Sequence, residues 1–219
     1  MKDRMKSVKT LGLATVAFAA VAMCLGAGPA SATVLCKSNK DTNTCGAANQ
    51  IGKGSSIMGT LATGTELIVE TSPGGTLVDT CTASTLKGSI ASAGSATTTV
   101  TLPVAKADLT FPTCSVKTDS IAGGELEIHW IPGTDNGTVT IKEFEIGIVF
   151  LGENCVYGFP KNFTDLGDLK GGNPAKLAFT YKIEKKNMCL WGPLELRLNA
   201  TYAFTEAGMG NTTMYVTSG

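Results

Sequence analysis

Short segments of strand-like composition, separated by turns that contain glycine and proline, constrain the fold of this chain most strongly. The segments are rich in Thr, Val, Ile and aromatic residues, and no long window shows the 3.6-residue period of an amphipathic helix. Turn motifs such as SPGG, PGTDNG and LKGGNP lie between them. The pattern predicts an all-β, antiparallel β-sandwich, Ig-like or jelly-roll-like. The predicted strands are 65–71, 76–85, 97–104, 108–116, 124–131, 137–150, 176–183, 194–204 and 213–217.

The segment 194–204 alternates strictly, with apolar residues at Leu194 and at every second position after it. This alternation predicts a strand with one face in the core. The small, uncharged residues of 89–99 predict instead a flexible connection or a lightly packed edge. We expect a single β-sandwich domain over 33–219, and the alternative is two small β domains divided near 117–124.

The two segments that flank the PGTDNG turn predict a half-buried hairpin. Pairing Ile131 with Thr138 across the turn places Glu127 opposite Lys142, where the two charges would attract each other. After Lys142 the apolar positions change from odd to even numbers. This change predicts a β-bulge at Lys142 and Glu143.

The first 32 residues predict export. A basic stretch precedes the charge-free run LGLATVAFAAVAMCLGAG, and Ala30-Ser31-Ala32 is a small-residue site of the kind that signal peptidases cut. We therefore expect a signal peptide over 1–32, a mature chain that begins at Thr33, and a secreted, extracellular product with no membrane contact after cleavage. A lipid anchor at Cys24 is the minor alternative.

The cysteines predict a disulfide framework. An even number of them in an exported chain indicates disulfides, and pairing neighbours along the chain closes the shortest loops. Zinc sites need closer cysteine pairs or several histidines, so neither a metal nor another cofactor is expected. Calcium binding by the turn motifs PGTDNG and DLGDLKGGN stays open. The six mature cysteines are Cys36, Cys45, Cys81, Cys114, Cys155 and Cys189.

The charge of the mature chain argues against nucleic acid as a partner. The whole chain has 18 basic and 18 acidic residues, and four of the basic and one of the acidic ones lie in the first 32, which leaves 14 against 17. No run of Lys or Arg remains to follow a phosphate backbone.

Candidate catalytic groups are sparse. His129 is the only histidine, and it falls mid-strand on an outward face without a nucleophile motif such as G-x-S-x-G. A glycosidase needs two carboxylates across a cleft, but alternating glutamates more often keep a strand soluble, and DLGDLKGG looks like a turn. A hydrolase built from scattered carboxylates is therefore the alternative function, and it requires two of them to share a concave cleft. The candidate pairs are Glu125 with Glu127, Glu143 with Glu145, and Asp165 with Asp168.

Trp191, in CLWGP beside Cys189, is the candidate ligand contact. Trp130 and Tyr202 share their strand faces with aliphatic residues, so core packing explains them better. A tryptophan packed on a disulfide is also common in sandwiches. We therefore predict a non-enzymatic extracellular protein, a binding module or a structural component at the cell surface. Cell wall or polysaccharide is the candidate partner, and a carrier of a small apolar ligand is a lesser alternative that a sizeable apolar pocket would favour.

Several short motifs lie in order along residues 34–217: VLCK, a second cysteine followed by AAN, VDTCTASTLKG, LTFPTC and KGGNPAKL. They resemble a group of small exported proteins of high-GC Gram-positive bacteria. The resemblance implies secretion and a disulfide-bearing, β-rich fold. The group is uncharacterised, so it implies no catalytic residue, ligand or partner. The charged segment IKEFEIGIVFLGEN differs from the sequence pattern that is usual in the group.

Overall fold

The computed structural model describes residues 33–38, 45–95, 98–208 and 213–218, and the predicted signal peptide at 1–32 lies outside them. The chain from Ser31 to Gly219 forms one compact unit. Every pair of strands in the described residues is antiparallel. The predicted all-β, antiparallel class is therefore confirmed.

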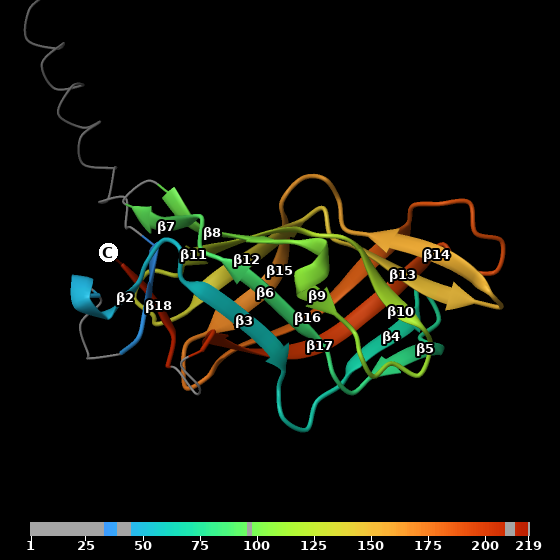
Figure 1. Ribbon diagram of the computed structural model, residues 1–219, viewed down its shortest axis with the longest axis horizontal. Helices are drawn as coiled ribbons and strands as arrows, with labels where there is room; N and C mark the ends of the chain where they lie inside the picture. Colours follow the sequence, from blue (N-terminus) through green and yellow to red (C-terminus); the bar gives the residue numbers. More distant parts are fainter. Residues whose placement is uncertain (1–32, 39–44, 96–97, 209–212, 219) are drawn as a thin grey trace, which may run out of the picture. The chain divides into compact units, whose positions relative to one another are not determined.

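A long central hairpin, β16 (Ala175–Lys185) and β17 (Glu195–Glu206), organises the main sheet (Figure 1). Each strand is about twice the usual length of 5–6 residues, so each has different neighbours at its two ends. At one end β16 pairs with β15 (Thr164–Lys170) and β17 pairs with β3 (Ser56–Leu61). At the other end β16 pairs with β14 (Glu153–Gly158) and β17 pairs with β4 (Leu67–Thr71).

The other strands extend the sheet from these neighbours. One path runs β7-β8-β11-β12-β15 to the hairpin and continues through β3, β6 and β9, while β10 and β13 follow β14, and β5 follows β4. The edge strand β7 lies inside the stretch 89–99, which the sequence predicts as a connection or an edge. The bounds are β5 (Leu77–Cys81), β6 (Thr85–Ser89), β7 (Ser92–Ser95), β8 (Thr98–Val104), β9 (Leu109–Thr110), β10 (Thr118–Ala122), β11 (Gly124–Trp130), β12 (Gly137–Lys142) and β13 (Glu145–Phe150), with short 3-10 helices η1 (Ala47–Asn49) and η2 (Lys106–Asp108).

The main sheet curls into a half-barrel and is not a clear sandwich of two sheets. A sandwich needs two separate sheets, but here the long strands β16 and β17 carry one continuous sheet through its whole curl. Across the curl, β6 approaches β8 without pairing with it. A Cβ atom on Gly88 of β6 would lie 2.5 Å from the carbonyl oxygen of Pro103, so this approach requires glycine.

A small second sheet joins the two ends of the described chain. It has the order β18 (Tyr215–Ser218), β1 (Thr33–Cys36), β2 (Gln50–Ile51). Thr33, at which the mature chain is predicted to begin, pairs with Ser218, and its hydroxyl accepts a hydrogen bond from the Trp130 amide at 3.0 Å. The first and last strands are thus held to each other and to β11.

The core lies on the concave side of the half-barrel, and β17 contributes one whole face to it. Residues 196, 198, 200, 202 and 204 are all buried, as the alternation predicts. Leu194 is the exception. It precedes the first residue of β17 and is 76% exposed, because the strand pairing begins only at Glu195.

The predicted register of the β11–β12 hairpin is wrong by two residues. The amide of Ile131 donates a hydrogen bond to the carbonyl of Asn136 at 3.0 Å, so the loop has four residues, and the ladder starts from the pair Trp130–Gly137. Lys142 is therefore opposite Glu125, with Nζ 3.4 Å from the carboxylate, and not opposite Glu127. A shift of two residues leaves the predicted inward and outward faces unchanged.

Two further local predictions need correction. In place of a bulge, β12 ends at Lys142, Glu143 takes a positive φ of 66°, and the chain continues in β13 with different pairing partners. The segment DLGDLKGG is not a turn, because Asp165 to Lys170 belong to β15. Leu166 and Leu169 are buried there. The free energy gained by burying these two side chains is larger than the local preference of glycine and aspartate for a turn.

The described residues contain three disulfides, Cys36–Cys45, Cys81–Cys114 and Cys155–Cys189. These are the pairs of neighbours along the chain that the sequence predicts. The first closes the loop after β1, the second joins β5 to the segment between β9 and β10, and the third joins β14 to the loop between β16 and β17.

Candidate binding surfaces

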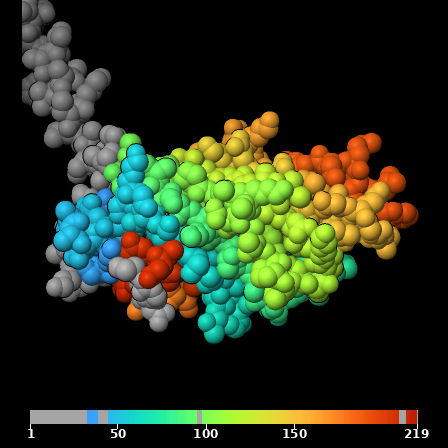
Figure 2. Space-filling view, viewed as in Figure 1, coloured from blue at the N-terminus to red at the C-terminus, as the bar shows by residue number. Residues whose placement is uncertain are grey.

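The loop between β16 and β17 presents apolar side chains to solvent. Residues 187–194, NMCLWGPL, carry no charge. Soluble proteins seldom expose apolar side chains in such a group. Figure 2 shows the orange-red atoms of this loop projecting beside the orange atoms of β13 and β14. We call the exposed group the apolar tip; it consists of Met188 (102% exposed), Leu190 (83%), Trp191 (61%), Leu194 (76%) and Leu151 (82%), the last on the adjoining β13–β14 turn.

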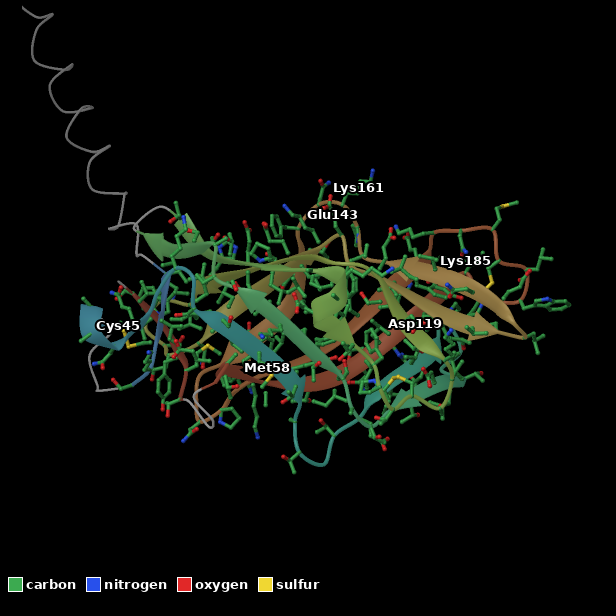
Figure 3. All side chains as sticks on the ribbon, viewed as in Figure 1. Cys45, Met58, Asp119, Glu143, Lys161 and Lys185 are labelled. Carbon is green, nitrogen blue, oxygen red and sulfur yellow. A yellow bond between two sulfur atoms is a disulfide. The ribbon has the colours of Figure 1, made fainter. Side chains whose placement is uncertain are left out.

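The backbone of this loop is tied to the strands beneath it. The disulfide Cys155–Cys189 fixes its middle to β14. Lys185, at the end of β16, donates hydrogen bonds from Nζ to the carbonyls of Cys189 at 2.8 Å and Gly192 at 2.9 Å (Figure 3). A Cβ on Gly192 would lie 2.5 Å from the Tyr157 hydroxyl, so only glycine fits at this position.

A buried tyrosine and a glutamate complete the anchoring. The hydroxyl of Tyr157 donates to the carbonyl of Pro193 at 3.0 Å, and burial raises the pKa of Tyr157 to about 12, so the donor stays protonated even in alkaline solution near pH 10. The amide of Leu190 donates to the Glu153 carboxylate at 2.9 Å, which also joins the loop to the β13–β14 turn. The polar backbone groups therefore face the protein, while the apolar side chains project away from it.

Sequence reasoning found one member of the apolar tip. Trp191 was the candidate ligand contact, and the structure places it in solvent rather than against the core. The other four members were missed. The signal for Met188, Leu190 and Leu194 was the absence of charge over 187–194, which the sequence alone does not distinguish from a buried segment, and Leu151 lies outside that segment.

The half-barrel encloses a second candidate, an apolar cavity of about 70 Å³. Only leucine, isoleucine, phenylalanine and Tyr202 line it among the described residues. The Tyr202 hydroxyl is hydrogen-bonded to the Ser84 hydroxyl at 2.6 Å, and burial raises the pKa of Tyr202 to about 12. The lining thus offers no free polar atom to a water molecule or to a polar ligand.

One of the three predicted carboxylate pairs shares a cleft. Glu143 and Glu145 line a cleft of about 300 Å³ together with Lys161 and Lys186. Figure 3 shows Glu143 and Lys161 near each other on one edge of the half-barrel. Glu143 reaches this position through its positive φ of 66°, at the switch from β12 to β13. This cleft meets the geometric condition set for the hydrolase alternative.

The remaining candidates do not form sites. His129 lies on the exposed face of β11, with Nε2 3.6 Å from the Glu127 carboxylate, and its side chain is 43% exposed. Asp79, Cys81 and Cys114 bring their oxygen and sulfur atoms within 4.8 Å of one another, the only such group in the described residues. The two cysteines form a disulfide and therefore offer no thiolate to a metal. Among the residues that the structure describes, the aspartates of PGTDNG and DLGDLKGGN are not part of any such group.

In the part of the chain that the structure describes, no helix is long and apolar enough to cross a membrane. The five residues of the apolar tip lie on loops between strands. Comparison with known proteins found no matching family model, no matching curated protein and no matching solved structure.

Proposed function

We propose that this chain is a secreted, non-enzymatic binding protein that attaches to a lipid surface at the cell exterior through its apolar tip, in place of the sequence-based expectation of no membrane contact. The observation that carries the proposal is the combination of a firmly anchored loop backbone with apolar side chains that project into solvent. Burying each of these side chains in an apolar phase is worth about 1.5–3 kcal/mol. Because the loop is already ordered, little of this free energy is lost on binding.

The composition of the tip favours lipid over polysaccharide. A sugar site needs an aromatic platform with polar side chains that hydrogen-bond the hydroxyl groups, whereas the exposed residues that accompany Trp191 on its loop are leucine and methionine. A second copy of the chain is also a poor occupant. A stable protein interface takes about 20–30 residues on each side, and the tip offers five apolar ones. Insertion into the headgroup and acyl boundary needs only a few such anchors.

The absence of charge in the tip predicts binding that depends on apolar contact alone. Residues 187–194 have no acidic or basic side chain, so anionic lipid should not be required and added salt should not weaken binding. We expect the secreted protein to bind vesicles of neutral phosphatidylcholine equally well at low and high salt. The chain has two tryptophans, so a Trp130→Phe background leaves Trp191 as the only tryptophan reporter, and its emission should shift to the blue on binding.

Trp191→Ala should weaken vesicle partitioning by about tenfold to a hundredfold, from the transfer free energy of the lost side chain. Met58→Ala is the control, because Met58 is a partly exposed apolar residue on β3 outside the tip. Equal binding by the two variants, or loss of binding in high salt, would contradict the proposal. Failure to bind vesicles, together with Trp191-dependent binding to cell-wall polysaccharide, would replace lipid with polysaccharide as the partner.

The cleft shared by Glu143 and Glu145 supports a second candidate function, an extracellular hydrolase. The leading proposal predicts that the purified protein releases no product from glycoside substrates or cell-wall glycans. Removal of a catalytic acid or base typically costs a factor of about 10²–10⁴. Turnover that Glu143→Gln and Glu145→Gln each lower about a hundredfold, while the exposed Asp165→Asn control does not, would establish the hydrolase instead.

A further inference from the structure

The apolar cavity has a surface groove beside it. The groove, of about 520 Å³, is lined by residues 106, 107, 109–112 and 118–120. Leu109 and Phe111 line both the groove and the cavity, so the two spaces are separated by two apolar side chains. Phe111 is only partly buried and follows the two-residue strand β9 on a segment without regular structure. Rotation of Phe111 would join the cavity to the groove.

The sizes of the two spaces determine what they can hold together. The cavity, at about 70 Å³, is about half the volume of an apolar cavity of about 150 Å³ that takes benzene, so it suits the end of an aliphatic chain rather than a ring. The groove alone is within the range of about 300–1,000 Å³ that is typical of ligand sites. A single aliphatic chain can therefore end in the cavity and continue along the groove.

The groove also provides partners for a polar head. Asp119 is 3.6 Å from Lys117, whereas Lys106 has no carboxylate within ion-pair distance among the described residues. Ser120 contributes a buried hydroxyl without a hydrogen-bond partner in the same part of the chain. The uncommitted ammonium of Lys106 suits a carboxylate, whereas the buried Ser120 hydroxyl would reach it only after its side chain rotates.

We propose that this second site binds a single-chain aliphatic carboxylate, with the end of its tail in the cavity behind Phe111 and its head beside Lys106. The site is separate from the apolar tip and does not depend on attachment to lipid. Ligand occupancy would add a carrier role to the binding function.

The experiment uses decanoate and the purified secreted protein with 13C-labelled methyl groups. We expect decanoate to shift the methyl signals of Leu126 and Leu177, which line the cavity, and to leave exposed Leu77 unchanged. Lys106→Gln should weaken binding about tenfold. Lys53→Gln, which removes the same charge from an exposed lysine outside the groove, is the matched control and should have little effect.

Three results would overturn this proposal: no shift in the cavity methyl groups, equal loss of binding in Lys106→Gln and Lys53→Gln, or loss of decanoate binding in Trp191→Ala. The last result would place decanoate at the apolar tip. Because Trp191→Ala should weaken vesicle binding and spare decanoate binding, the two proposals can fail separately.

Discussion

Replacing Asp79 by alanine should lower the free energy of unfolding by about 3–5 kcal/mol. Asp79 is 1% exposed on β5, and its carboxylate accepts four hydrogen bonds. Each buried donor left without a partner costs about 1–3 kcal/mol, and water entering the space offsets part of the total. The donors are the amides of Thr80 and Val116 at 2.8 Å and the hydroxyls of Ser115 at 2.8 Å and Thr118 at 2.7 Å.

The position of these donors explains why the effect should be large. Two of them, on Ser115 and Val116, lie on the segment that links β9 to β10, which has no regular structure of its own over 111–117, and Thr118 is the first residue of β10. Together with the disulfide Cys81–Cys114, the Asp79 carboxylate fixes this segment to β5. The same segment begins with Phe111, so Asp79 also positions one wall of the cavity.

Equilibrium unfolding in urea measures the change. Asp79→Asn keeps one oxygen acceptor and should cost less than Asp79→Ala. Asp119→Ala is the matched control, because Asp119 is exposed and surface substitutions are usually within about 0.5 kcal/mol of the wild type. A cost for Asp79→Ala that is no larger than that of Asp119→Ala would contradict this role.

Local sequence patterns predicted the features that depend on neighbouring residues. The alternation of apolar residues predicted the buried face of β17. Successive side chains of any strand point to opposite faces, and this period of two does not depend on the strand's place in the fold. The cysteine pairs were predicted because short loops are the least costly to close. The buried hydrophobic positions of β12 and β13 were also predicted, including the change of parity between Ile141 and Phe144.

Features that depend on distant contacts were not predicted. The curl of the sheet follows from neighbours that β16 and β17 find far away in the sequence, and no local pattern records them. In the sequence, Asp79 in VDTC resembles an ordinary polar strand residue. Its buried hydrogen bonds form only in the folded protein, because donors such as the Val116 amide come from a distant segment. The hairpin register failed because PGTDNG can close as a four-residue or a six-residue loop, and the Ile131–Asn136 hydrogen bond selects the shorter one.

The apolar tip illustrates the same limit at a binding surface. In the sequence, NMCLWGPL is an uncharged segment around a cysteine, and burial of Trp191 against the disulfide was the ordinary expectation. In the structure Lys185 and Tyr157 donate hydrogen bonds to backbone carbonyls of the loop. Because these bonds hold the backbone against the strands, the side chain of Trp191 projects into solvent. Neither contact is visible in the local sequence.

The paired substitution Cys155→Ala with Cys189→Ala should reduce both stability and attachment to lipid. The bridge spans 34 residues, and the entropy of closing a loop of that size predicts a loss of about 4 kcal/mol in the free energy of unfolding. The loop would keep its contacts to Lys185 and Tyr157 but would have to be ordered again on binding. An ordering cost of about 1.5 kcal/mol corresponds to about tenfold weaker vesicle partitioning.

The matched control is Cys36→Ala with Cys45→Ala, which removes a bridge spanning nine residues at a different part of the fold. The same entropy relation predicts a loss of about 3 kcal/mol for this smaller loop, and vesicle binding should be unchanged because the apolar tip is intact. Urea unfolding gives the two stabilities, and partitioning is measured well below the unfolding midpoint of each variant. If both paired variants lose vesicle binding to the same extent, binding follows global stability, and the disulfide Cys155–Cys189 has no particular part in presenting the apolar tip.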